Sequence, residues 1–245
     1  MIIEARPRTA RRPVAFAVAM AGFFLVFVGL GSWQVQRLFW KLDLIERVDA
    51  RVHAEAVPAP GPSTWPGIDA ANDEYRRVSV TGRLLNDKET LVQAVTERGA
   101  GFWVLTPLLT ADGTTILINR GFIPPDRRDP SSRSHGLAES EVTISGLLRI
   151  SEPGGAFLRL NDPEGDRWYS RDVTAIAQSR GLTNVAPYFI DADATPNPGS
   201  YPVGGLTVIA FRNSHLVYAL TWYALAAMSA GACLYLIRQG RRHGR

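Results

Sequence analysis

The chain has a single cysteine, Cys233, and it lies within a long apolar run close to the C-terminus. One cysteine cannot form an internal disulfide framework or a CxxC metal site. At that position it also cannot supply a nucleophile to the polar part of the chain. Cysteine usage therefore excludes these classes of protein, but it does not indicate a redox compartment.

Histidine is also scarce, with four in 245 residues. The polar central region contains only His53 and His135, and both stand in polar surroundings without a pattern. No HxxxH, GxSxG, Walker or GxGxxG motif occurs. The sequence therefore predicts a protein that is not an enzyme.

Two segments have no charged side chain: residues 14–33, a run of 20, and residues 216–237, a run of 22. At about 1.5 Å per residue, either run is long enough to cross roughly 30 Å of hydrocarbon as a helix. The first run exceeds the 7–15 residues or so of a signal-peptide core, so it predicts an uncleaved anchor. The sequence thus indicates two transmembrane helices.

The basic pI of about 9.5 comes from the two ends of the chain. Residues 1–13 and residues 238–245 each contain four arginines, and without these ends the chain has 19 basic and 22 acidic residues. Terminal clusters of this kind indicate membrane topology rather than nucleic-acid binding. They predict that both termini lie in the cytoplasm and that the centre of the chain lies on the other side of the membrane. Because no presequence precedes the first span, we expect a bacterial inner membrane with a periplasmic centre.

The predicted organisation has five parts. These are a cytoplasmic basic segment 1–13, a first span 14–35, a periplasmic mainly-β domain 36–212, a second span 213–237 led by a histidine, and a basic tail 238–245.

Small residues recur at helical spacing in both spans and predict close packing against another helix. In the first span the stripe is Gly22, Val26, Gly29 and Trp33, and in the second it is Ala219, Ala226 and Ala230. The partner helix could belong to the same molecule or to another membrane protein.

The central region shows the alternation typical of antiparallel strands. Residues 37–53 favour a helical continuation of the first span, residues 171–180 favour one further helix, and residues 124–136 a solvated loop. The predicted fold is two transmembrane helices flanking a mainly antiparallel β domain, a barrel or sandwich with one helix. The expected strands are 76–84, 89–96, 101–109, 114–122, 142–150, 185–191 and 206–211.

One histidine, His215, stands at the start of the second span. On a helix, Tyr218 and Trp222 would fall on the same face as His215. An imidazole beside two aromatic rings can ligate a metal or hold a planar ligand. The alternative is an aromatic belt at the membrane surface with an interfacial histidine.

An ordered set of short motifs resembles the surfeit-locus-one family of cytochrome c oxidase assembly factors, over about residues 29–226. The motifs are Gly31-x-Trp33-Gln34-x-x-Arg37, Tyr75-x-x-Val78-x-Val80-x-Gly82, Gly101-Phe102-x-Val104-Leu105-Thr106-Pro107-Leu108, Leu117-Ile118-Asn119-Arg120-Gly121-Phe122, Val142-x-Ile144-x-Gly146-x-Leu148-Arg149 and Arg212-Asn213-x-His215-Leu216-x-Tyr218-Ala219-x-Thr221-Trp222.

The resemblance implies a two-span membrane protein that delivers haem a to cytochrome c oxidase subunit I or assists its insertion. The histidine that starts the second span is the family's candidate haem a ligand, and in this sequence that residue is His215. The implied partners are subunit I, haem a synthase and membrane lipid, with haem a bound in passing.

The resemblance leaves the roles of several other residues open. Trp33, Gln34 and Arg37 are either an interface anchor or part of a haem pocket, and Arg37 and Arg212 can pair with a propionate or a lipid phosphate. Asn119-Arg120-Gly121 is expected to end a strand in a turn. The expected haem-binding set is therefore His215, Tyr218, Trp222, Trp33, Arg37 and Arg212, with His215 on the iron.

Three functions remain open from the sequence. The first is a haem a chaperone, and the second is a scaffold that stabilises a subunit I intermediate without binding haem. The third is a haem-modifying enzyme, against which the scarcity of acid–base and metal-binding residues counts.

The arginine clusters generate a topology prediction. Reporters active only in the cytoplasm should be active when fused at either terminus, and a fusion at Asp129 should report the opposite side of the membrane. A cytoplasmic signal from the Asp129 fusion would contradict this arrangement.

Overall fold

The structure, a computed structural model, describes residues 11–136, 140–156, 158–194 and 201–243 of the chain. It divides into two compact units, one formed by the chain up to Glu46 together with the chain from Ala210 onward, and the other by Arg47–Ile209. The first unit contains the two long apolar helices, and the second contains the sheet. His135 lies in a stretch whose side chains are outside the described part.

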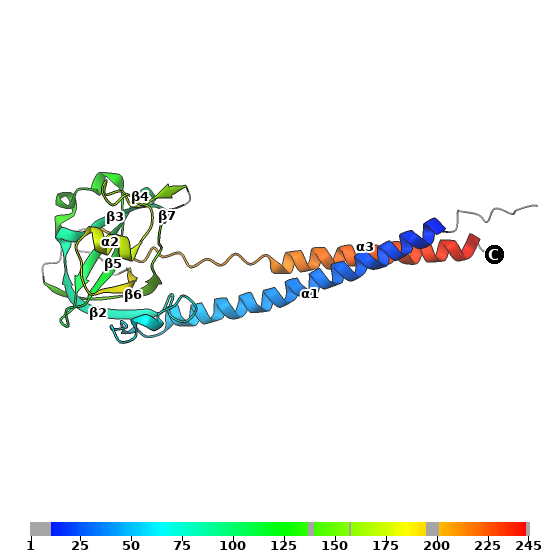
Figure 1. Cartoon of the computed structure of the whole chain (residues 1–245), viewed down its shortest axis with the longest axis horizontal. Coiled ribbons are helices and arrows are strands. Elements are labelled where there is room, and N and C mark those ends of the chain that lie inside the picture. Colours follow the sequence, from blue (N-terminus) through cyan, green and yellow to red (C-terminus); the bar gives the residue numbers. More distant parts are fainter. Residues whose placement is uncertain (1–10, 137–139, 157, 195–200, 244–245) are drawn as a thin grey trace, which may run out of the picture. The chain divides into compact units, whose positions relative to one another are not determined.

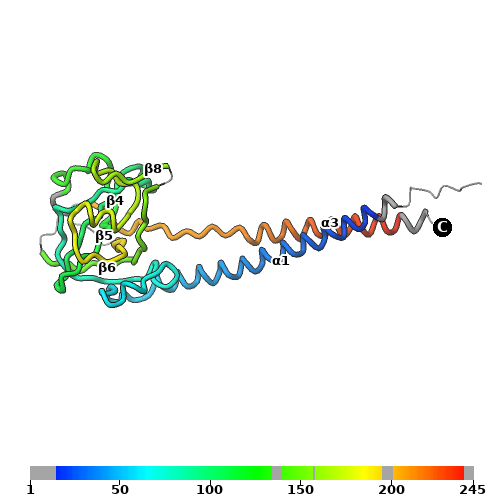
Figure 2. Tube along the Cα trace, viewed as in Figure 1, coloured from blue at the N-terminus to red at the C-terminus, as the bar shows by residue number. Residues whose placement is uncertain are grey.

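The two long helices are α1 (Arg11–His53) and α3 (His215–His243), which Figure 2 shows as the blue and the orange-to-red helical traces. Each contains a segment long and apolar enough to span a membrane, which confirms the two predicted spans. Their large apolar side chains are mostly exposed, as expected where lipid covers a helix. With 43 residues, α1 is about 65 Å long at about 1.5 Å per residue, so it extends well beyond the hydrocarbon.

The helices α1 and α3 pack closely at Gly31. A β-carbon on Gly31 would lie 2.8 Å from a ring carbon of Tyr223, so a larger residue there would require the Tyr223 ring to shift. The Tyr223 hydroxyl lies 3.3 Å from Ser32 Oγ, and about one turn before Gly31, Phe27 stacks on Trp222 with ring centroids 5.7 Å apart. This face of α1 is therefore the one that contacts α3.

The small-residue stripe of the first helix does not contact α3, whereas that of the second is partly buried. Gly22 and Gly29 have no neighbouring atom within 4 Å of an added β-carbon, and Val26 is exposed. In α3, by contrast, Ala219 and Ala226 are buried as expected. Both faces of a spanning helix are apolar, so spacing of small residues alone did not distinguish the face toward lipid from the face toward α3.

Strands build the second unit, and Figure 1 labels β2 to β7. Their bounds are β1 Val57–Pro58, β2 Arg77–Leu84, β3 Thr90–Thr96, β4 Gly99–Leu109, β5 Thr115–Ile123, β6 Glu141–Ile150, β7 Gly155–Ala156, β8 Arg159–Leu160 and β9 Val185–Ala192. The short helix α2 spans Val173–Ser179, and 3-10 turns occupy Trp65–Gly67, Asn86–Lys88, Pro125–Arg127 and Pro130–Gly136.

The main sheet closes into a barrel. Its strand order is β1-β2-β6-β9-β5-β4-β3, and β2 also pairs with β4 through Arg83↔Leu109 and Leu84↔Leu108. Most pairs are antiparallel, while β5–β9 and β1–β2 are parallel. The prediction of a mainly β domain with one helix is confirmed, and closure leaves few strand edges exposed.

Alternating residues along the strands face opposite sides of the sheet, and each side has its own hydrophobic core. Ile116 and Ile118 point into the closed sheet, where they meet apolar side chains from β2, β4, β6 and β9. Leu117 points to the outer face and packs with Phe189 and with Ile176 of α2. Helix α2 begins at the predicted place because Asp172 caps it, accepting a hydrogen bond from Ala175 N at 3.1 Å.

Two of the sequence expectations for this unit were wrong. Residues 206–211 form no strand, because the chain turns at Gly205, which has a φ of +71°. The N–H of Gly205 donates a hydrogen bond to the carbonyl oxygen of Ala192, the last residue of β9. Residues 124–136 are not a simple solvated loop, since they form 3-10 turns and bury Arg133 in an ion pair with Glu89.

Gly121 supports the end of β5 and tests this architecture. It has a φ of +128°, and a β-carbon there would lie 2.1 Å from Val203 O. Gly121→Ala should therefore lower the thermal midpoint of the domain, measured by circular dichroism of the full chain in detergent, through both a strained backbone and a backbone clash.

Gly113→Ala is the matched control. Gly113 has a φ of +81° in the turn between β4 and β5, with no atom within 4 Å of an added β-carbon. Gly113→Ala should lower the free energy of unfolding only through backbone strain, by about 1–2 kcal/mol. If Gly121→Ala lowers the midpoint no more than Gly113→Ala does, the close approach of residue 203 does not exist.

Candidate functional site

His215 is the first residue of α3, and its side chain turns toward α1. Its Nδ1 lies 2.7 Å from Oε1 of Gln34, a residue 181 positions earlier in the chain. The imidazole is partly buried, so this hydrogen bond is sheltered from competing water. The contact ties the start of the second span to the end of the first.

The hydrogen bond determines which ring nitrogen holds the proton. An amide oxygen can only accept, so Nδ1 is the donor, and the neutral ring then has its lone pair on Nε2. Nε2 makes no hydrogen bond to any residue in the described part of the chain. His215 is therefore poised to use Nε2 as a ligand.

The two aromatic residues expected beside His215 have different surroundings. Trp222, seven positions on, lies on the face toward α1 and stacks on Phe27. Tyr218, three positions on, is 54% exposed. At about 100° per residue, a step of seven returns within about 20° of the starting direction, whereas a step of three departs by about 60°.

The other expected site residues of the spans are exposed. Trp33 is 51% exposed, Arg212 is exposed, and Arg37 places its guanidinium 4.8 Å from the ring centre of Trp40. The structure does not join any of these three to His215 by a hydrogen bond or ion pair. It does bring Lys41 of α1 over the ring of Phe211, at 4.7 Å, just before α3 begins.

Among the described residues, no group of three or more His, Cys, Asp or Glu side chains could hold a metal ion. The site at His215 accordingly offers one protein ligand within this unit. Its chemistry suits a metal already held by other donors, such as the four nitrogens of a porphyrin.

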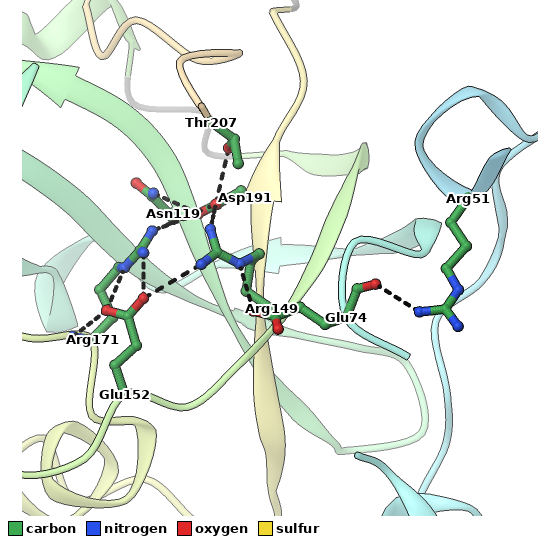
Figure 3. Close-up of polar contacts among 8 residues, drawn as sticks. All are labelled: Arg51, Glu74, Asn119, Arg149, Glu152, Arg171, Asp191 and Thr207. Atoms are coloured by element: carbon green, nitrogen blue, oxygen red, sulfur yellow. Dashed lines mark hydrogen bonds and ion pairs between the residues drawn. The ribbon is translucent and has the colours of Figure 1, made fainter. Parts of the chain in front are cut away.

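A second polar site lies within the barrel unit and is centred on Asp191, whose side chain is only 3% exposed. Its carboxylate accepts bonds from Asn119 at 2.7 Å, Arg149 at 2.9 Å, Arg171 at 3.1 Å and Thr207 at 2.9 Å. Figure 3 shows these side chains converging on Asp191 from separate segments. The hydrogen bond from Thr207 holds this part of the chain against the outer face of the sheet.

Both arginines of this cluster are held on several sides. Arg171 forms a two-pronged contact with Glu152, Arg149 reaches Glu74 at 3.3 Å, and both guanidinium groups lie over the ring of Phe189. Burial alone would lower the pKa of Arg149, but the attraction of Asp191 and the neighbouring acidic groups outweighs it and raises that pKa. Arg149 therefore keeps its charge at neutral pH.

A pocket of about 380 Å³ opens beside the cluster. Its polar side is formed by Asn119, Arg149, Arg171, Asp191 and Thr207, and its apolar side by Val95, Trp103, Leu206 and Val208. Because Asp191 and its partners already satisfy one another, the cluster's main effect is to hold sheet, α2 region and residues 205–208 together.

The sequence interpretation did not find the Asp191 cluster. Asn119 and Arg149 stood within recognised motifs, but Asp191, Arg171 and Thr207 had no local signal of function. Asp191 and Thr207 stand between apolar neighbours, but Arg171 stands between Ser170 and Asp172. The pairing of these residues depends on the order of strands in the closed sheet.

Fold and site together define a two-span membrane protein whose remaining domain is a closed β-barrel with one packed helix. The family model described as SURF1 family matches residues 21–227. Surfeit locus protein 1 of Rattus norvegicus is 38% identical over 229 residues, covering 85% of this chain and 72% of the relative. The chain belongs to the SURF1 family.

Two further relatives give the same picture. Surfeit locus protein 1 of Homo sapiens is 39% identical over 82% of this chain and 71% of its own length. A SURF1-like protein of Monosiga brevicollis is 40% identical over 88% of this chain and 85% of its own length. The family match over residues 21–227 covers the barrel and part of each span.

The buried cluster gives a stability prediction. Asp191→Ala leaves Arg149 and Arg171 without their shared buried partner, which typically costs about 3–5 kcal/mol. At about 2–4 °C per kcal/mol for a domain of this size, the thermal midpoint should fall by roughly 10 °C, measured by circular dichroism.

Asp162→Ala is the control for loss of an ion pair at the surface. Asp162 bonds Arg167, whose side chain is 65% exposed, so its removal should leave the midpoint nearly unchanged. Equal midpoints for the two variants would show that the Asp191 cluster does not stabilise the barrel.

Proposed function

We propose that this protein binds haem a through His215 and assists its delivery or insertion into subunit I of cytochrome c oxidase. Membership of the SURF1 family implies a role in assembling cytochrome c oxidase. The haem-binding step is the part that His215 supports. In this role the protein acts as a carrier without catalysing a reaction.

The observation that supports the proposal is the hydrogen bond from His215 Nδ1 to Gln34 Oε1. It leaves Nε2 with a lone pair and no protein partner, which is the state in which an imidazole ligates iron. Without such a bond, a neutral histidine in water holds its proton mainly on Nε2 and must change tautomer before Nε2 can ligate. The sequence alone indicated the histidine but not its tautomer.

The surroundings of His215 fit a large apolar ligand with acidic edges. Trp222 and Tyr218 offer aromatic surface within two turns, and Trp33 adds an exposed ring at the end of the first span. Arg37 and Arg212 supply exposed cations suited to propionates. We assign these five residues to the same haem site as His215, with membrane lipid as the competing partner of the arginines.

A single protein ligand also suits a carrier. Two axial ligands in a closed cage would hold haem firmly, whereas one imidazole at a partly open position allows transfer to a second protein. We assign the receiving partner as oxidase subunit I and the donating partner as haem a synthase. We place His215 and the barrel on the periplasmic side of a bacterial inner membrane, with both termini in the cytoplasm.

A second candidate function is a scaffold that stabilises an oxidase assembly intermediate without haem. The same hydrogen bond favours it, because a contact between Gln34 and His215 also fastens α1 to α3. The two functions differ in what removal of the imidazole does to bound haem.

The test is the absorption spectrum of the protein purified from cells that make haem a. His215→Ala should abolish the haem bands, because the iron loses its protein ligand, while membrane level and insertion stay unchanged since the apolar run begins at Leu216. Oxidase activity in the same cells should fall, with subunit I lacking haem.

Leu220→Ala is the control, since Leu220 lies in the same helix and is 62% exposed. It should retain the haem bands of the wild type. Full haem retention by His215→Ala, combined with loss of oxidase activity, would contradict the carrier and support the scaffold.

A further inference from the structure

We infer that Gln34 is a positioning residue that holds His215 in the tautomer and orientation needed to present Nε2 to haem iron. This inference rests on the proposed function, and it assigns a role to a residue of the first span that makes no contact of its own with the iron. The two spans would then form one site together, with the ligand on one helix and its orienting group on the other.

The geometry fixes Gln34 opposite His215. Gln34 lies three positions after Gly31, where the helices approach closely, and seven after Phe27, which stacks on Trp222. These spacings place all three residues on one face of α1. The packing one turn away holds the two helices close together at this level, so the Gln34 amide reaches the imidazole at 2.7 Å.

The chemistry follows from the acceptor. Histidines that ligate metals generally donate their other ring N–H to an oxygen acceptor, which fixes the tautomer and ring plane and raises the basicity of the ligating nitrogen. Gln34 Oε1 is such an acceptor, and it belongs to a neutral amide. A carboxylate at this place would increase the basicity of Nε2 further and bind the iron more tightly, which is a disadvantage in a protein that must release haem.

The first measurement uses the haem-free full-length protein in lipid nanodiscs. With ¹⁵N-labelled histidine, the chemical shifts of the two ring nitrogens of each of the four histidines report which nitrogen is protonated. In mildly alkaline buffer, His215 should have its proton on Nδ1 in the wild type, and on Nε2 mainly in Gln34→Leu. A wild-type His215 protonated mainly on Nε2 would overturn the inference.

The second measurement is haem a affinity, followed by spectral titration of the same samples. Gln34→Leu should weaken haem a binding by about 10–100-fold, the usual effect of removing the hydrogen-bond partner of a metal-ligating histidine. Gln34→Glu keeps an acceptor oxygen, so it should restore binding to at least the wild-type affinity and slow haem release.

The matched control is Gln36→Leu, the same change two positions along α1 at an exposed site. It should alter neither the His215 tautomer nor the haem affinity. Equal affinities in Gln34→Leu, Gln36→Leu and the wild type would overturn the inference, as would an equal loss in Gln34→Leu and Gln34→Glu.

Failure of this inference is distinguishable from failure of the proposed function. If His215→Ala loses haem while Gln34→Leu binds it normally, His215 is the ligand and Gln34 does not position it. If His215→Ala retains haem in full, both the proposed ligand and its positioning residue are wrong, whatever the tautomer.

Discussion

The close approach of α1 and α3 at Gly31 is the constraint on which the candidate site depends. Lipid chains are as apolar as the helix surfaces, so two spans associate through close packing and hydrogen bonds rather than through a hydrophobic driving force. The absence of a side chain at Gly31 lets the Tyr223 ring lie against the backbone. One turn further along α1, that separation brings Gln34 within hydrogen-bonding distance of His215.

The same constraint explains why a polar pair is tolerated at the end of a span. A histidine or glutamine facing lipid would leave donors or acceptors without partners, which is costly in an apolar environment. Facing each other, Gln34 and His215 satisfy one nitrogen and one oxygen and leave Nε2 for a further partner. The lone pair on Nε2 is the group that the proposed haem binding would use.

Within the barrel unit, a charged cluster holds segments together that apolar packing holds together elsewhere. The inner face of the closed sheet is filled by apolar side chains, and α2 covers part of the outer face through Ile176 and Phe189. Beyond Phe189 the outer face becomes polar, and Asp191 joins two arginines to Thr207. Breaking such a buried set is costly because each lost partner leaves a charge without compensation. Thr207 and its neighbours are held against the sheet for that reason.

The local elements were predictable from the sequence because their signals are local. Two uncharged runs determined the spans, alternation determined most strands to within a residue or two, and the positions of Asp172 and Gly181 bracket α2. The motif order determined the family, and His215 at the start of the second span determined the candidate ligand. The strand expected at residues 206–211 does not form, although its residues alternate, because the chain turns at Gly205 just before them.

Long-range pairing was decided only by the tertiary structure. A spanning helix is apolar on every face, so periodicity could not choose Gly31 over Gly22 and Gly29 as the contact. The partner of His215 lies 181 positions away, and no local pattern marks an amide as the acceptor for a particular imidazole. The neighbours of Asp191 likewise follow from strand order in a closed sheet. The sequence by itself determined which residues could do chemistry in this protein, and packing between distant segments decided which of them meet, because contact depends on helix rotation and strand register rather than on composition.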